Sequence, residues 1–204
     1  MKEKRYEIHK NCLYIIDPRL KIEIEEDFFL PTVSFDAKKE KIQGVSIEKD
    51  KNGEIKKIYR EEKGKYHGQC ILFYPNRKKL GEMFYDKNRL HGPSKFYSQE
   101  GKILSITWFF YGQKQGEVKR YYSSGQIYSE ESFVDNYQEG IQKYYYENGR
   151  EKTILYYKNG VLDGLATLFH HNGNIKRKTF FSKENGMEKD EIYSENGDLI
   201  DEEK

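Results

Sequence analysis

The chain has 204 residues, of which 36% are hydrophobic, 34% charged and 15% aromatic, with 18 Tyr and 12 Phe. So many rings exclude a disordered chain, and the small hydrophobic fraction argues against a deep globular core. We therefore expect a thin structure that packs large rings, because a ring buries much area and still tolerates a wet edge. The net charge of +2 is too small to indicate a nucleic-acid or membrane partner.

Charge is distributed unevenly along the chain. Residues 44–115 hold 15 basic and 8 acidic side chains, whereas residues 116–204 hold 12 basic and 17 acidic ones. In an elongated molecule this asymmetry could steer a partner or favour head-to-tail self-association. Drift among solvated surface positions is the alternative explanation.

The first 43 residues contain no repeat. Residues 22–24 alternate like a strand, and residues 28–31 are apolar. Open-ended repeat arrays need covered ends, so we interpret residues 1–43 as an N-terminal cap, with a small functional appendage as the alternative. The apolar run at residues 12–16 is too short for a signal peptide, and Cys12 and Cys70 show no disulfide or zinc spacing. We expect a cytoplasmic protein.

A 24-residue repeat begins at Gly44 and determines the predicted fold. Three columns of residues that tolerate positive φ recur with this period. The second column follows the first by nine residues and is interrupted only by Arg77, and the third follows the first by twenty. The columns are Gly44, Gly68, Gly92, Gly116, Gly140 and Gly164; Gly53, Gly101, Gly125, Gly149, Gly173 and Gly197; and Gly64, Asn88, Gly112, Asn136 and Gly160.

Each repeat holds two strand-like segments and no helical periodicity. The first segment ends in a pair such as Asn148-Gly149, which is a strong signal for a tight hairpin turn. The second closes on turns that look looser, such as residues 111–113 or 158–160. The sequence predicts an all-β fold, an elongated single-layer antiparallel β-meander solenoid of 24-residue β-hairpin repeats. Residues 44–204 hold about six repeats and a partial C-terminal one, whose acidic finish would protect the last edge.

Aromatic side chains also recur with the period of the glycine columns. One column lies five residues after the first glycine and another lies seventeen after it. We expect equivalent rings of successive repeats to stack as ladders that hold the fold together. The columns are Phe73, Tyr97, Tyr121, Tyr145, Phe169 and Tyr193; and Tyr85, Phe109, Phe133, Tyr157 and Phe181.

The joints between repeats resemble those of a known family. Residues 64–68 (G-K-Y-H-G) and 88–92 (N-R-L-H-G) are similar to the joint of MORN repeats, and residues 121–125 (Y-Y-S-S-G) and 145–149 (Y-Y-E-N-G) are similar to its Tyr-Tyr-x-x-Gly element. The period is closest to that of the bacterial MORN-variant group, whose members are commonly labelled YwqK-type antitoxins. The resemblance implies protein–protein contacts, lipid contacts or scaffolding. A leucine-rich repeat is excluded because the leucines are out of register.

No catalytic motif is found, so we expect no enzyme and no cofactor. His67 and His91 precede the glycine of consecutive repeats, in a column that continues as Gln115, Glu139 and Asp163. Every member can accept a hydrogen bond, which favours a structural role at the joint over a metal site. We predict no metal ligands, because a metal site would need more of them than this column offers.

The first functional hypothesis is a non-catalytic protein-binding or scaffolding module, with an antitoxin or immunity protein that binds a partner along its sheet face as its more specific form. Tyrosine is favoured at recognition surfaces. Adjacent tyrosines should point to opposite faces, so only one of each pair would serve. The candidate binding residues are Tyr97, Tyr121, Tyr122, Tyr145 and Tyr146.

The alternative is a peripheral binder of anionic lipid or nucleic acid that uses the basic half, residues 44–115. Arg77, Lys78 and Lys79 form a basic patch near aromatic residues, an arrangement that suits phosphate and stacking contacts. Three basic residues at a turn are also typical of a solvated loop. Binding of this kind would weaken steeply with added salt.

Overall fold

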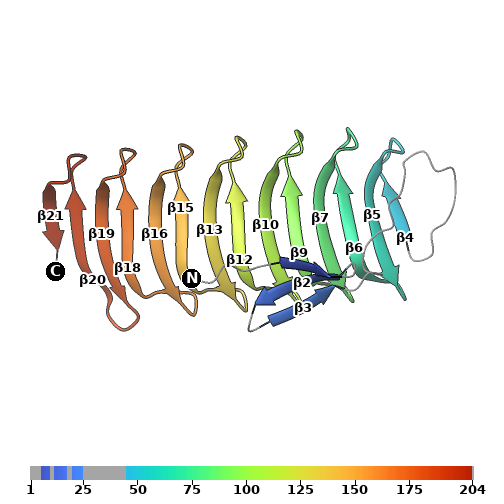
Figure 1. Cartoon of the computed structure of the whole chain (residues 1–204), viewed down its shortest axis with the longest axis horizontal. Coiled ribbons are helices and arrows are strands. Elements are labelled where there is room, and N and C mark those ends of the chain that lie inside the picture. The colour runs from blue at the N-terminus through green and yellow to red at the C-terminus, as the bar shows by residue number, and fades with distance from the viewer. Residues whose placement is uncertain (1–5, 10–11, 18–19, 25–44, 204) are drawn as a thin grey trace. The chain divides into compact units, whose positions relative to one another are not determined.

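The computed structural model describes residues 6–9, 12–17, 20–24 and 45–203. Within these residues all helical or strand structure consists of β-strands, with no helix, and the repeats form successive antiparallel hairpins (Figure 1). This confirms the predicted all-β meander of hairpin repeats. The chain divides into two compact units. Unit 1 comprises residues 1–103 and 108–113, unit 2 comprises residues 104–107 and 114–204, and strand β10 (Ile103–Phe110) contributes to both.

Unit 1 begins with a three-stranded antiparallel sheet of β1 (Tyr6–His9), β2 (Cys12–Asp17) and β3 (Leu20–Ile24). Strand β3 includes the alternating segment expected at residues 22–24. The apolar residues 28–31 of the predicted cap lie outside the described residues. The repeats of unit 1 form β4 (Val45–Lys49), β5 (Ile55–Glu62), β6 (Lys65–Phe73), β7 (Lys79–Asp86), β8 (Arg89–Leu90) and β9 (Gly92–Tyr97).

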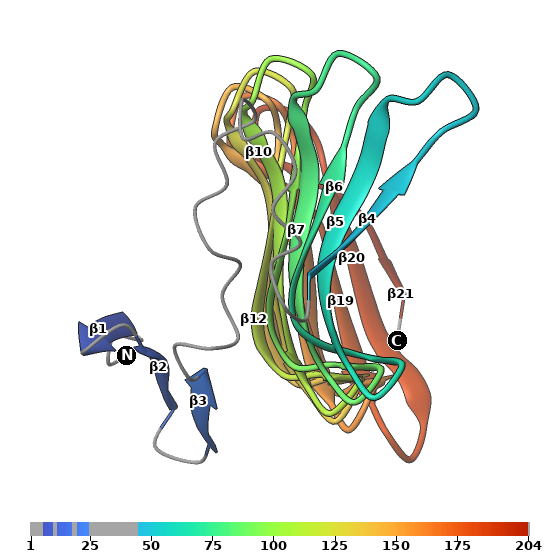
Figure 2. The same ribbon diagram turned by 90° about the vertical axis from the view of Figure 1, so that its right-hand side faces the viewer.

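Unit 2 continues the same hairpins to the end of the described chain. In the side view the repeat strands of each unit form one layer (Figure 2). The remaining strands are β11 (Gln113–Lys114), β12 (Gly116–Tyr121), β13 (Ile127–Val134), β14 (Tyr137–Gln138), β15 (Gly140–Tyr145), β16 (Glu151–Lys158), β17 (Val161–Leu162), β18 (Gly164–Phe169), β19 (Ile175–Ser182), β20 (Gly186–Tyr193) and β21 (Leu199–Glu203).

The Asn-Gly pairs lie in three-residue hairpin loops rather than in two-residue ones. Between β15 and β16, the amide of Gly149 donates to the carbonyl of Tyr146 over 2.9 Å, and the amide of Tyr146 donates to the carbonyl of Arg150 over 2.8 Å. Gly149 has φ of 83°, while Asn148 is not left-handed and accepts the amide of Arg150 through its side chain. Arg77, which replaces this glycine in one repeat, adopts φ of 65°.

The two-residue turns occur at the places where the sequence analysis expected looser turns. Asn159 and Gly160 have φ of 51° and 79°, and such a pair of left-handed residues defines the type I′ hairpin turn. The prediction of looser turns at residues 111–113 and 158–160 is therefore wrong. The prediction failed because the strand after each of these turns has only two residues, too few to be recognised as a hairpin strand from the sequence. The same turn recurs at Lys63-Gly64, Lys87-Asn88, Tyr111-Gly112 and Asp135-Asn136.

One face of the sheet, here called the core face, is defined by a column of buried residues two positions after the first glycine. Val118 and Gln142 have no exposed surface, and the column pairs with buried Met83, Glu131 and Thr179 on the neighbouring strands. Its members are Cys70, Ser94, Val118, Gln142, Ala166 and Asp190.

Ring contacts join different columns instead of stacking members of one column. In unit 2, Tyr128 lies 5.2 Å from the ring of Tyr122 and 6.1 Å from that of Tyr144, both in edge-on contact. Equivalent rings of successive repeats are separated by an intervening strand, and two strand spacings amount to about 10 Å. The expected ring ladders are therefore replaced by contacts between unlike positions of neighbouring strands.

Candidate binding surface

The predicted binding tyrosines fall into two structural groups. Tyr122 and Tyr146 immediately precede the three-residue loops, and each hydroxyl donates to a backbone carbonyl of the next repeat, that of Tyr145 and that of Phe169, over 2.7 Å in both cases. Tyr74 does the same in unit 1. These hydroxyls join consecutive hairpins, and the rings are half-buried.

Tyr97 and Tyr145 lie on the face opposite the core face, here called the second face. The hydroxyl of Tyr97 donates to Glu82 over 3.2 Å, and that of Tyr145 donates to Glu130 over 2.8 Å. Burial, together with the carboxylate of Glu82, raises the pKa of Tyr97 to about 12. Burial and Glu130 likewise raise the pKa of Tyr145. Both hydroxyls therefore stay protonated and bound within the sheet.

Tyr121 also belongs to the second face, because side chains alternate along β12 and Val118 occupies the core face. It is half-buried and pairs with Ile127 across the hairpin. Tyr122, by contrast, contacts Tyr128 and through it Tyr144 of the core face. The five candidate tyrosines thus do not share one face of the sheet.

The basic patch is divided by local ion pairs. Arg77 binds Glu54 through its Nε at 2.9 Å, and this contact lowers the pKa of Glu54. Lys79 lies 3.1 Å from Glu82 and 5.6 Å from the centre of the Tyr97 ring. Lys78 is exposed between them. Arg77 and Lys79 are thus each paired with a carboxylate of their own.

Three members of the histidine column, His91, Gln115 and Glu139, act at the joint between repeats, as the sequence indicated. Nδ1 of His91 accepts the amide of Tyr111 over 3.4 Å, and Gln115 and Glu139 accept the equivalent amides of Asp135 and Asn159 over 2.7 Å. Each acceptor thus holds the first residue of the next type I′ turn. Among the described residues, no group of three or more His, Cys, Asp and Glu is placed to hold a metal ion.

Two carboxylates are buried in the core face, and each pairs with an arginine. Glu131, 5% exposed, pairs with Arg120 and accepts the hydroxyl of Ser129 over 2.8 Å. Asp190, 4% exposed, binds Arg177 and accepts the hydroxyl of Thr179 over 2.6 Å. The hydrogen bond from Arg177 lowers the pKa of Asp190. Both of these buried carboxylates are therefore neutralised by an arginine and hydrogen-bonded to a hydroxyl.

Exposed apolar side chains gather on the second face of unit 2, where sequence analysis predicted no site. Leu165 pairs directly with Phe180 across β18 and β19. Tyr156 of β16 lies on the same face, beside the start of β18, where a Cβ atom added at Gly164 would lie 3.2 Å from its Cβ. Tyr156, Leu165 and Phe180 are 39%, 38% and 43% exposed, and we call them the apolar band. A possible signal was the absence of charge at these three positions, while neighbouring residues such as Lys178 are charged.

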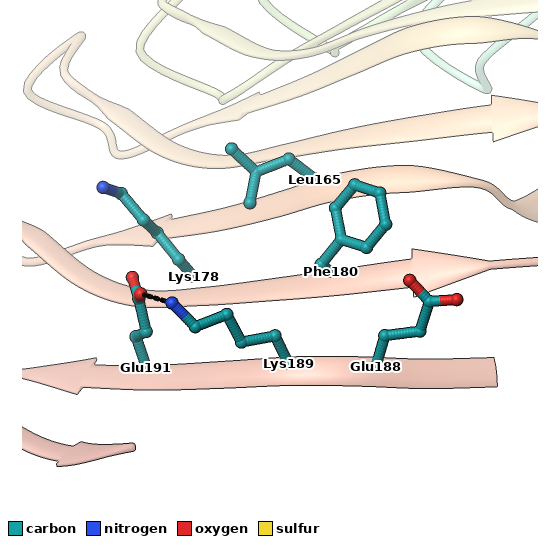
Figure 3. A pocket seen from close by; sticks show the side chains of 6 residues that line it. All are labelled: Leu165, Lys178, Phe180, Glu188, Lys189 and Glu191. Atoms are coloured by element: carbon teal, nitrogen blue, oxygen red, sulfur yellow. Dashed lines mark hydrogen bonds and ion pairs between the residues drawn. The ribbon is translucent and has the colours of Figure 1, made fainter. Parts of the chain in front are cut away.

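A shallow hollow of about 480 Å³ adjoins this band (Figure 3). Leu165 and Phe180 form its apolar part, and the other lining side chains are charged. Lys189 binds Glu191 at 2.5 Å and Glu202 at 3.1 Å, whereas Lys178 lies 5.5 Å from the centre of the Tyr193 ring. The charged residues lining the hollow are Lys178, Glu188, Lys189 and Glu191. The hollow thus combines an apolar floor with charges of both signs, as protein-binding surfaces do.

Comparison with known protein families identifies a family that the repeats resemble. Residues 90–110, 114–135, 138–159 and 162–183 match the family described as MORN repeat variant. The four matches follow one another in tandem between residues 90 and 183. Each matched segment starts at the end of the short strand after a type I′ turn and ends at the last residue of the following long strand or one residue beyond it. No curated protein matches the chain.

MORN repeats are generally associated with binding and scaffolding, and proteins built from them are typically non-catalytic. The apolar band lies within the matched region, on strands β16, β18 and β19. The described residues include no helix that could span a membrane.

Proposed function

We propose that the chain is a non-catalytic protein-binding module whose partner docks on the second face of unit 2, over the apolar band. The proposal rests on the exposure of the band. Its three large apolar side chains lie together on neighbouring strands, and each is more than one third exposed. Contiguous exposed apolar surface is a mark of interaction sites. The charged side chains around the hollow would form the polar rim that such interfaces have.

The MORN-variant match supports the same function, because arrays of this kind are generally used for binding or scaffolding. An antitoxin or immunity role is a finer form of the proposal, in which the partner is a toxin and the module blocks it. Its support is the resemblance of the joints to those of YwqK-type proteins. In that case the captured partner would arrest growth when it is expressed without this chain.

The test is affinity capture from the native cell with the wild-type chain and with Phe180→Glu. We expect one partner at a fixed stoichiometry, bound by the wild type and lost in the variant, because a carboxylate within the band would have to be desolvated on binding. Val161→Glu is the matched control. Val161 is also exposed, at 45%, but lies outside the band.

Thermal unfolding of all three proteins verifies that the band variant remains folded. Equal loss of the partner in Val161→Glu and Phe180→Glu would contradict a site at the band. If no protein is captured but the chain binds anionic vesicles or RNA in a salt-dependent way, the lipid or nucleic-acid alternative replaces the proposal.

A further inference from the structure

The outer edge of β21 has no partner strand within the described part of the chain. Strand β21 pairs with β20 through Glu191 and Glu202 and through Ile192 and Asp201, and Figure 1 shows it as the last strand of its unit. Leu199 and Ile200 of β21 are 53% and 65% exposed. A strand edge with unpaired backbone groups is a template for another strand.

In two earlier hairpins, a glutamate at one position of the repeat is bound by the next hairpin. Glu82 faces Lys95 of that hairpin and accepts the hydroxyl of Tyr97 over 3.2 Å. Glu130, two repeats further along the chain, faces Lys143 and accepts the hydroxyl of Tyr145 over 2.8 Å. In both places the glutamate is met by Lys-x-Tyr on the following strand.

The opposite charge order occurs one hairpin before the edge. Lys178 takes the position of the glutamate there, and the residue facing it is Glu191. Charges of opposite sign are therefore paired across these three junctions, and such cross-strand pairs stabilise a sheet.

Glu202 occupies the same repeat position as Glu82 and Glu130, five and three repeats after them, but no described strand follows it. Its present partner is Lys189 of its own hairpin, at 3.1 Å. A strand added in the usual register would set Lys opposite Glu202, a second cation opposite Asp201, and Tyr within reach of the carboxylate of Glu202.

We propose that β21 accepts an extended segment of another protein that carries Lys-x-Tyr, preferably Lys-Arg-Tyr, as an added antiparallel strand. A second copy of this chain fits less well. Its first repeat strand, β4, would place Ile47 opposite Glu202 and Glu48 opposite Asp201, so that two carboxylates would meet. Acidic residues alone would only protect the edge, but the exposed Leu199 and Ile200 also offer apolar area to a partner.

The probe is a fluorescent peptide of residues 116–123, which contains Lys119, Arg120 and Tyr121 in the required order. Binding to the full chain is measured by fluorescence anisotropy. We expect saturable binding that Glu202→Lys weakens about tenfold, the effect of losing one hydrogen bond to a charged group. The peptide with Lys119→Glu should bind the wild type poorly and regain affinity for the Glu202→Lys protein.

Glu195→Lys is the matched control, since it makes the same charge change in an exposed turn. Phe180→Glu should leave peptide binding intact. The proposal for the edge of β21 and the proposal for the apolar band can therefore be refuted independently. Absence of peptide binding, or equal binding to wild type and Glu202→Lys, would overturn the proposal. Concentration-dependent self-association that Glu202→Lys abolishes would also overturn it, because the edge would then take a second copy.

Discussion

At the scale of single residues, the core of this sheet depends on polar side chains that are fully satisfied. The Gln142 side chain has no exposed surface. Its carbonyl accepts the amide of Ser132 over 2.8 Å, and its amino group donates to the carbonyls of Ser132, Glu139 and Gly140 over 3.1 to 3.3 Å. One side chain thus holds the strand entry after Glu139 against the neighbouring strand.

Replacing Gln142 by Val, the residue found at the equivalent Val118, should lower the free energy of unfolding by about 1–3 kcal/mol, because buried backbone groups lose their partner. Urea denaturation measures the difference. Gln126→Val is the control, since Gln126 is exposed. Equal stability of the wild type and Gln142→Val would mean that the backbone groups find other partners.

Sequence reasoning at this scale succeeded where a column shared a chemical property. The acceptor column was predicted to hold the joint, and the contacts of His91, Gln115 and Glu139 confirm it. It could not foresee that the hydroxyl of Tyr122 reaches the backbone carbonyl of Tyr145 in the next repeat. Nothing local in a sequence tells whether a tyrosine hydroxyl faces solvent or a neighbouring strand.

At the scale of elements, the type I′ turn and the acceptor before the next hairpin form one joint. The joint at His91 differs from the others because its acceptor can be protonated. Burial of the imidazole lowers the pKa of His91, although Asp86 opposes the shift. The side chain is 9% exposed, and protonation of Nδ1 would remove the acceptor for the amide of Tyr111.

This joint predicts a loss of stability in mild acid. Because the pKa of His91 is lower in the folded chain, the unfolded chain binds the proton first as the pH falls below about 6.5. The free energy of unfolding should therefore fall between pH 7.5 and pH 5. His91→Gln, which copies Gln115, should lose part of that dependence while keeping the acceptor. Urea denaturation at both pH values tests this, and an unchanged pH dependence in His91→Gln would assign the effect to other groups.

The apolar band shows what sequence patterns miss at the element scale. Strand and turn positions followed from the glycine columns, but neither the exposure of Phe180 nor its pairing with Leu165 could be read from them. In a single layer both faces border solvent, so an apolar residue on a strand indicates burial only weakly. Exposure depends on the size of side chains on neighbouring strands, which the period alone does not specify.

At the scale of the whole molecule, the repeat period is the quantity that the sequence specifies best. It predicted the hairpins of both units and the further hairpin of β20 and β21. The division through β10 could not be predicted, because the repeat columns run through it without interruption. The cap interpretation of residues 1–43 stays a prediction, since residues 25–44 lie outside the described chain.

Removing one full period should be tolerated. Deletion of residues 116–139 joins Gln115 to Gly140, so that every column stays in register and β10 meets β15 in place of β12. We expect cooperative thermal unfolding to be preserved, because each repeat contacts mainly its neighbours. Deletion of residues 116–135 is shorter than one period and should abolish cooperative unfolding, because the columns shift. Circular dichroism melting distinguishes the two. Similar melting of both deletions would contradict the importance of the period.

Near-identical hairpins could also pair with the wrong neighbour during folding, one whole repeat out of place, because the faces of the sheet would still match. The core-face column counters this error. Asp190 requires the side chains of Arg177 and Thr179, whereas Val118 at the equivalent position requires neither. A hairpin docked one repeat out of place would bury the carboxylate without its partners, at a cost of about 1–3 kcal/mol or more. The differences between repeats thus favour pairing of each hairpin with its correct neighbour over pairing one repeat out of place.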